Sequence, residues 1–130
     1  RTGLKVRLSG NPFVPKAHTP LQWSAFEGAT MGKRLKLLRK TVKGVEMEAE
    51  SPREAYVQAA IARGDGGLAP VLARSLDHGG GYSAFRRAAR EEGLDLEEYT
   101  GHRPLDKPLP WSRIDAGARG LERLYRRFTG

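Results

Sequence analysis

The stretch Ser51-Pro52-Arg53-Glu54-Ala55-Tyr56-Val57-Gln58-Ala59-Ala60-Ile61-Ala62-Arg63-Gly64 predicts the best-defined helix of this chain. Ser51 suits the N-cap, Pro52 suits the first helical position, and Glu54 stands at the third position of a capping box. Gly64 is a typical C-terminal stop. The pattern therefore predicts a helix that begins after Ser51 and ends at Arg63.

The sequence before this helix predicts two short strands and a second helix. Apolar and polar residues alternate over 4–9 and again over 45–49, which is typical of strands. Between them, an apolar stripe predicts a helix over 26–42; its members are Met31, Leu35, Leu38 and Val42. Three prolines within 11–23 predict a stiff, extended loop after the first strand.

The sequence after the central helix predicts three more helices, at 68–78, 82–92 and 118–128, and a short turn capped by Asp95. A second proline-rich loop is expected over 101–111. The expected fold class is therefore α+β: a small, mainly helical domain with one or two short strands.

The length of 130 residues suits one domain, and the absence of cysteine restricts its chemistry. Without cysteine the chain holds no disulfide, thiolate nucleophile or Cys-ligated cluster of its own. The three histidines do not share a helical spacing that would favour a metal site. Because no apolar run is long enough to span a bilayer, we expect no membrane partner and a cytoplasmic location.

The net charge of +8 is concentrated on the helix expected near residues 31–43. Its cationic residues are Lys33, Arg34, Lys36, Arg39, Lys40 and Lys43. A solvated helix face is the commoner role of such a charge run. The alternative is a basic RNA-binding or protein-docking module, although no sequence motif for specific nucleic-acid recognition is present.

The segment from Asn11 to Trp23 carries the densest set of functional groups and resembles a loop of one enzyme group. These are radical S-adenosylmethionine enzymes, bacterial Fe–S oxidoreductases often fused to a cobalamin-binding-like N-terminal domain. Their loop, after the last barrel strand, follows approximately the pattern S-x-F-V-P-K-P-H-T-P-F-Q-W. This chain departs from the pattern at Ala17 and Leu21 and keeps the polar residues.

Two further blocks extend the resemblance over nearly the whole chain. The first combines Ser51 and Glu54 with Ala62-Arg63-Gly64-Asp65, although Gly66-Gly67 replaces two arginines of the family pattern. The second combines Gly93-Leu94-Asp95 and Tyr99 with the segment 106–115, which contains Pro108-Leu109-Pro110-Trp111. By residue type alone, Arg63 and Asp65 predict a helix C-cap with a local ion pair.

The resemblance implies a C-terminal portion of such an enzyme, which does not bind the cluster and is inert in isolation. Residues 1–25 would be the last barrel strand and the substrate-side loop, and residues 26–130 a helical C-terminal extension that forms one compact unit. The parent's four-iron, four-sulfur cluster needs a C-x-x-x-C-x-x-C motif, which this chain lacks. The implied cofactors of the parent are that cluster and S-adenosylmethionine, with cobalamin a further candidate.

The resemblance also implies roles for loop residues. Asn11, Phe13 and Val14 would lie near the cofactor, and the substrate would contact Lys16, His18, Gln22 and Trp23. The alternative is a loop held in place by its own hydrogen bonds, with Phe13 and Trp23 as core or lid anchors.

The implied partner is the N-terminal barrel of the same parent chain. The open edge of the strand at 4–9 could instead pair with a second copy. The chain begins at Arg1 and its first methionine is Met31. Either a tag and initiator were removed, or the chain belongs to a longer protein.

Overall fold

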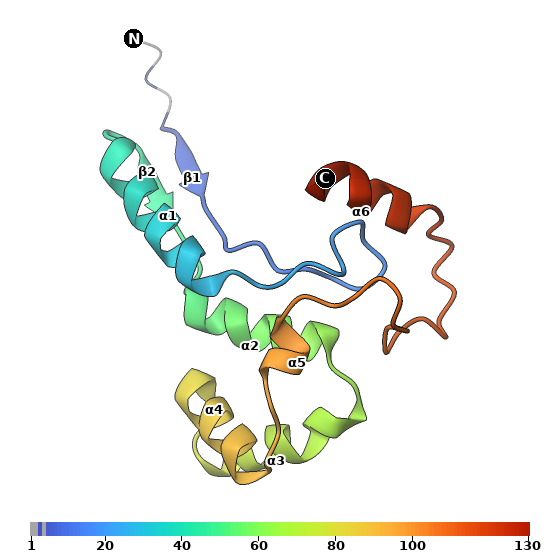
Figure 1. The fold of residues 1–130 in the computed structure, drawn as a ribbon. Coiled ribbons are helices and arrows are strands. Elements are labelled where there is room, and N and C mark those ends of the chain that lie inside the picture. Colours follow the sequence, from blue (N-terminus) through green and yellow to red (C-terminus); the bar gives the residue numbers. More distant parts are fainter. Residues whose placement is uncertain (1–2, 4) are drawn as a thin grey trace.

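Helix α2 (Pro52–Arg63) lies at the centre of the computed structural model, which describes residue 3 and residues 5–130 (Figure 1). The predicted N-cap is confirmed, since the Ser51 hydroxyl oxygen accepts a hydrogen bond from Arg53 N at 3.3 Å. Two hydrophobic clusters meet on α2, one through Ala60 and the other through Ala55 and Ala59. This helix therefore joins the two halves of the fold.

The first cluster packs α2 against the helices that follow it. These are the 3₁₀ helix η1 (Gly66–Leu68), α3 (Ala69–Asp77), α4 (Gly81–Glu91) and α5 (Glu97–Thr100). Their buried apolar side chains surround Phe85, which is 1% exposed. The Asp95 carboxylate accepts from Glu97 N at 2.9 Å, as the predicted short turn requires. The helices predicted at 68–78 and 82–92 are thus confirmed within a few residues.

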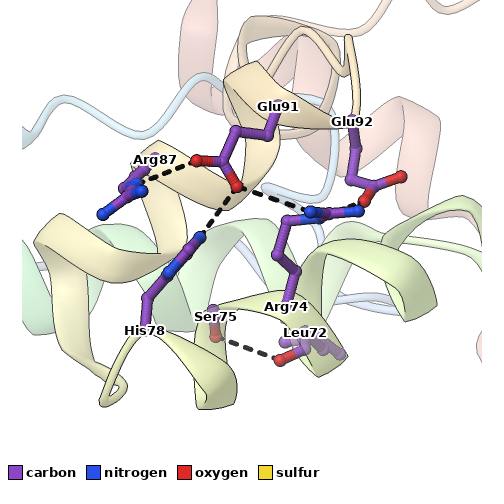
Figure 2. Close-up of polar contacts among 7 residues, drawn as sticks. All are labelled: Leu72, Arg74, Ser75, His78, Arg87, Glu91 and Glu92. Atoms are coloured by element: carbon purple, nitrogen blue, oxygen red, sulfur yellow. Dashed lines mark hydrogen bonds and ion pairs between the residues drawn. The ribbon is translucent and has the colours of Figure 1, made fainter.

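Ion pairs link α3 and the residue that follows it to the C-terminal end of α4 (Figure 2). Glu91 accepts from His78 Nε2 and from Arg87 Nε, both at 2.8 Å, and lies 3.7 Å from Arg74 Nη1. Arg74 Nε also bonds to Glu92. Hydrogen bonds from His78 and Arg87 lower the pKa of Glu91 to about 2.

The N-terminal part forms a parallel β–α–β unit from β1 (Arg7–Ser9), α1 (Gly28–Thr41) and β2 (Glu46–Glu48). The two strands pair with Leu8 opposite Met47. A parallel pair requires a crossover connection, which the first proline-rich loop and α1 provide. The strand predicted at 4–9 is shorter than expected, and Leu4 lies outside the described residues. The strand predicted at 45–49 is confirmed.

This β–α–β unit leaves much apolar surface uncovered. All three residues of β1 are exposed, and Val6 just before it is 57% exposed. On α1, Leu35 is buried, but Leu37 and Leu38 are 64% and 46% exposed. The helix predicted over 26–42 is confirmed as α1, although Leu38 of its apolar stripe stays exposed because, in the described part of the chain, no layer covers that side of α1.

The two proline-rich loops lie side by side and carry the C-terminal helix α6 (Leu121–Thr129), on the side away from α3 and α4 (Figure 1). Trp23 of the first loop packs on Tyr125 of α6 with ring centroids 5.4 Å apart. The fold is mainly helical with two short parallel strands, which confirms the predicted α+β class. Within residues 3 and 5–130, no helix is both long and apolar enough to cross a bilayer.

Candidate functional site between the two proline-rich loops

The first loop is anchored to the centre of the fold at its beginning and end. Val14 is buried with Phe26 against Ala55 and Ala59 of α2. Phe26 N donates to the carbonyl oxygen of Thr100, the last residue of α5, at 2.8 Å. Pro15 is also fully buried. These contacts fix the chain on either side of the segment that contains His18.

Gln22 joins the two loops from a buried position. Its Oε1 accepts from His18 N at 3.0 Å within the first loop and from Trp111 Nε1 at 2.7 Å in the second. Gln22 is 5% exposed and Trp111 is 7% exposed. Both bonds use the same side-chain oxygen, so that oxygen serves the framework of the site. A contact between Gln22 and substrate remains a prediction.

His18 holds a strained backbone conformation. Its φ of +57° is the only positive φ of a non-glycine residue within the described chain. A left-handed conformation costs an L-residue about 1–2 kcal/mol, so the surroundings must hold it in place. The bond from His18 N to Gln22 does this, together with the Thr19 hydroxyl, which donates to Lys16 O at 2.8 Å.

A cavity of about 490 Å³ lies between the two loops. The first loop contributes three of the four predicted substrate residues, namely His18, Gln22 and Trp23. The polar lining from the second loop and the segment after it consists of Lys107, Ser112, Asp115 and Arg119. The two loops therefore form one site, although more than 80 residues separate them in the sequence.

The cationic groups at this cavity outnumber the acidic ones. Asp115 is engaged on both oxygens: Oδ1 accepts from Gly117 N at 2.8 Å, and Oδ2 lies 3.2 Å from Arg119 Nη2. Lys107 is exposed and makes no ion pair within the described residues. The cavity therefore carries a net positive charge even with His18 neutral.

Lys107, Ser112, Asp115 and Arg119 were not predicted from the sequence as site residues. Their proximity to Pro108-Leu109-Pro110-Trp111 was the available signal, since that block shares the resemblance with the first loop. The spacing along the chain does not show which loops meet, because that pairing depends on the buried bond between Gln22 and Trp111.

The remaining predicted residues lie outside this cavity. Lys16 is exposed and borders a separate apolar depression of about 200 Å³ with Phe13 and Val14. Phe13 is 47% exposed, so it is not a core anchor. Asn11 Oδ1 accepts from Glu50 N at 3.2 Å, which ties the start of the loop to the segment after β2.

Arg63 positions the second loop from a fully buried site at the end of α2. Its guanidinium donates to Thr100 O at 3.1 Å and to Gly101 O at 2.8 Å. Arg103 donates to Arg63 O at 2.9 Å and stacks over Trp111, 5.4 Å from the ring centroid. Burial, with the nearby Arg103 charge, lowers the pKa of Arg63 to about 10.

The predicted ion pair between Arg63 and Asp65 is wrong. Gly64 is extended (φ −81°, ψ 177°), and the chain turns so that Arg63 points inward. Asp65 instead accepts from Gly67 N at 2.9 Å and from the Tyr99 hydroxyl at 3.3 Å. A Cβ at Gly64 would overlap Leu68 Cδ1 and lie 3.0 Å from Ala60 O, so close packing explains the glycine.

The described residues include no group of three or more His, Cys, Asp or Glu side chains arranged to hold a metal ion. With no cysteine in the sequence, this chain offers no ligand set for an iron–sulfur cluster.

Comparison with known proteins gives one uncharacterized relative. The protein MJ0966 of Methanocaldococcus jannaschii is 31% identical over 112 residues. The match covers 85% of this chain and 23% of that protein, so the chain spans about a quarter of the length of the relative. No family model matches the chain, and no solved structure matches it significantly.

Proposed function

We propose that this chain is the C-terminal, non-cluster-binding part of a radical S-adenosylmethionine Fe–S enzyme, where it closes the barrel mouth and helps to bind substrate. The observation that carries the proposal is the position of the resembling loop. The loop follows the carboxyl end of β1 in a parallel β–α–β unit, where α/β folds place their ligand sites. Its residues His18, Gln22 and Trp23 line the cavity described above.

The uncovered sheet supports an N-terminal barrel as the partner. Parallel sheets are normally buried on both faces, and a two-stranded sheet is marginal alone. Here all of β1 is exposed, as is Val6 just before it, and Leu37 and Leu38 of α1 are exposed too. Further strands of the parent barrel would pair with the free edge of β1 and cover this surface. A second copy of the chain is the competing occupant of the same edge.

In the parent, the cluster would supply the electron that cleaves S-adenosylmethionine to the 5′-deoxyadenosyl radical, with cobalamin a further candidate cofactor. This chain contributes residues only. Asn11, Phe13 and Val14 belong to the cofactor side of the loop. On the substrate side, His18 and Trp23 form the cavity wall, Gln22 fixes the two loops, and Lys16 lies at the loop surface. A cytoplasmic, reducing location suits such a cluster.

The coding sequence upstream of Arg1 provides the first test. The proposal requires a C-x-x-x-C-x-x-C motif about one barrel length before this chain, and an oxygen-sensitive cluster in the anaerobically purified full-length protein. Replacing the three motif cysteines by alanine should remove the bound iron. An initiator methionine directly before Arg1 would overturn the proposal.

The basic face of α1 favours one alternative, an RNA-binding or protein-docking module. Lys33, Arg34, Lys36, Arg39 and Lys40 are all exposed, and none takes part in an ion pair of the described residues. Binding to phosphates through these groups should weaken steeply as salt rises.

A gel shift with single-stranded RNA at increasing salt tests this alternative. The double variant Lys36→Gln/Lys40→Gln should bind more weakly and with a shallower salt dependence than the native chain. The matched control is Arg90→Gln/Arg127→Gln, which removes the same charge from other exposed positions. If both double variants lose the same RNA affinity, the binding depends only on net charge, and a site on α1 is excluded.

A further inference from the structure

The cavity between the proline-rich loops combines cationic groups with an apolar wall. Lys107 and Arg119 bring two positive charges, and the half-buried His18 adds an imidazole. Asp115 is the one carboxylate among the described residues that line the cavity, and it already accepts from Gly117 N and pairs with Arg119. These charges therefore favour an anionic ligand, because the positive charge of Lys107, which no carboxylate of the lining pairs with, would repel a cation.

The lining of the cavity includes apolar as well as polar side chains. Trp23 and Trp111 line the cavity, and Ile114 at the same cavity remains 64% exposed. Small-molecule sites typically combine an apolar wall with a few convergent polar groups, in cavities of about 300–1,000 Å³. The volume of about 490 Å³ here lies in that range.

The two loops are also held in place before any ligand binds. Gln22 bridges His18 N and Trp111 Nε1, and Arg103 N donates to Trp23 O at 2.9 Å. Strain persists where surrounding contacts over-determine a conformation, and such positions cluster at ligand sites. His18, whose backbone is in the left-handed conformation, is such a strained residue and lies in the cavity wall.

We infer that this cavity binds an organic anion, whose carboxylate or phosphate group lies at Lys107 and Arg119 and whose apolar body lies against Trp23 and Trp111. The inference rests on the proposed function in one respect only, that this anion is the substrate of the parent enzyme. Binding itself requires neither the cluster nor the barrel.

The chain carries its own reporter for this test. Trp23 and Trp111 are its only tryptophans, and both line the cavity. Tryptophan emission of the 130-residue chain is measured during titration with phenyl phosphate, benzoate and neutral phenol at low salt. Saturable changes are expected with both anions, with phenol weaker by about tenfold, since hydrogen bonds to charged groups contribute about 1.5–3 kcal/mol. Equal affinity for all three probes would overturn the inference.

Two matched double variants locate the anion. Lys107→Gln/Arg119→Gln should weaken phenyl phosphate binding by about tenfold or more. Lys43→Gln/Arg127→Gln changes the net charge equally at exposed positions away from the cavity, and should bind as the native chain does. If phenyl phosphate binding weakens to a similar extent in both double variants, the assignment of the anion to Lys107 and Arg119 is wrong. Far-ultraviolet circular dichroism checks that each variant folds, and the single variant Lys107→Gln is the substitute if the double variant does not.

The two proposals fail separately in this design. If the chain binds the anions but the full-length protein lacks the cysteine motif, the proposed radical enzyme is refuted and the anion site is supported. If the full-length protein cleaves S-adenosylmethionine but the chain shows no saturable anion binding, the anion site is refuted and the proposed enzyme function is supported.

Discussion

Replacing Arg63 by methionine should destabilise the chain more than any exposed arginine substitution. Arg63 is fully buried at the end of α2 and donates hydrogen bonds to Thr100 O at 3.1 Å and to Gly101 O at 2.8 Å. Methionine fills much of the same volume but donates no hydrogen bond. The two carbonyl oxygens would then stay buried without these donors, which is costly.

The expected loss follows from these two bonds. A hydrogen bond from a charged donor contributes about 1.5–3 kcal/mol, so the pair contributes about 3–6 kcal/mol. Part of this is offset because Arg63→Met also removes a buried cation that Arg103 repels. We expect a net loss of about 2–4 kcal/mol in the free energy of unfolding. For a chain of this size that corresponds to a fall in Tm of roughly 8–16 °C.

Urea unfolding followed by far-ultraviolet circular dichroism measures this loss. The control is Arg74→Met on α3, where the side chain is 48% exposed and pairs with Glu91 and Glu92. Exposed ion pairs contribute about 0–1 kcal/mol, so this variant should lose less than about 1 kcal/mol. Equal losses in the two variants would refute the role assigned to Arg63.

Three further predictions concern glycine packing, acid stability and the link between the loops. Gly64→Ala should lower the free energy of unfolding in urea by about 1–3 kcal/mol, because the new Cβ would overlap Leu68. The control is Gly66→Ala, which should lower it far less because the position has open space. Similar losses in the two variants would contradict the packing argument. The Glu91 pKa of about 2, lowered from 4.5, means that its contribution to stability is full above pH 4.5 and is lost as the pH falls towards 2. The stability gap between the native chain and Glu91→Gln should therefore narrow over that range, and a constant gap would exclude this linkage. Trp111→Phe removes the donor to Gln22 and should destabilise the chain by about 1–3 kcal/mol in thermal unfolding, while an unchanged Tm would argue against the bridge.

Local sequence signals predicted most of the helices because their physical causes are local. The Ser51 cap and the following proline set the start of α2, and Gly79 and Gly80 separate α3 from α4. Both strands were predicted from their alternation, and they pair as the only sheet of the described residues. The end of α2 was also predicted correctly, with Gly64 as its C-cap, whereas the packing of Gly64 against Leu68 could not be foreseen from the sequence.

The site was predicted only in part because it depends on distant contacts. The resemblance selected His18, Gln22 and Trp23, which line one cavity, and Lys16, which does not. The other half of the cavity comes from residues 105–121, brought there by a bond between residues 89 positions apart. The apolar stripe through Leu38 correctly predicted a helix, yet Leu38 stays exposed, because such a stripe shows which face can pack and not whether a partner is present.

The proposed function is tested most directly by measuring 5′-deoxyadenosine formed from S-adenosylmethionine by the full-length protein. The protein would be purified anaerobically, reconstituted with iron and sulfide, and reduced with dithionite. We predict 5′-deoxyadenosine formation that disappears when the motif cysteines are replaced by alanine. A protein that binds no cluster and forms no 5′-deoxyadenosine under these conditions would contradict the account.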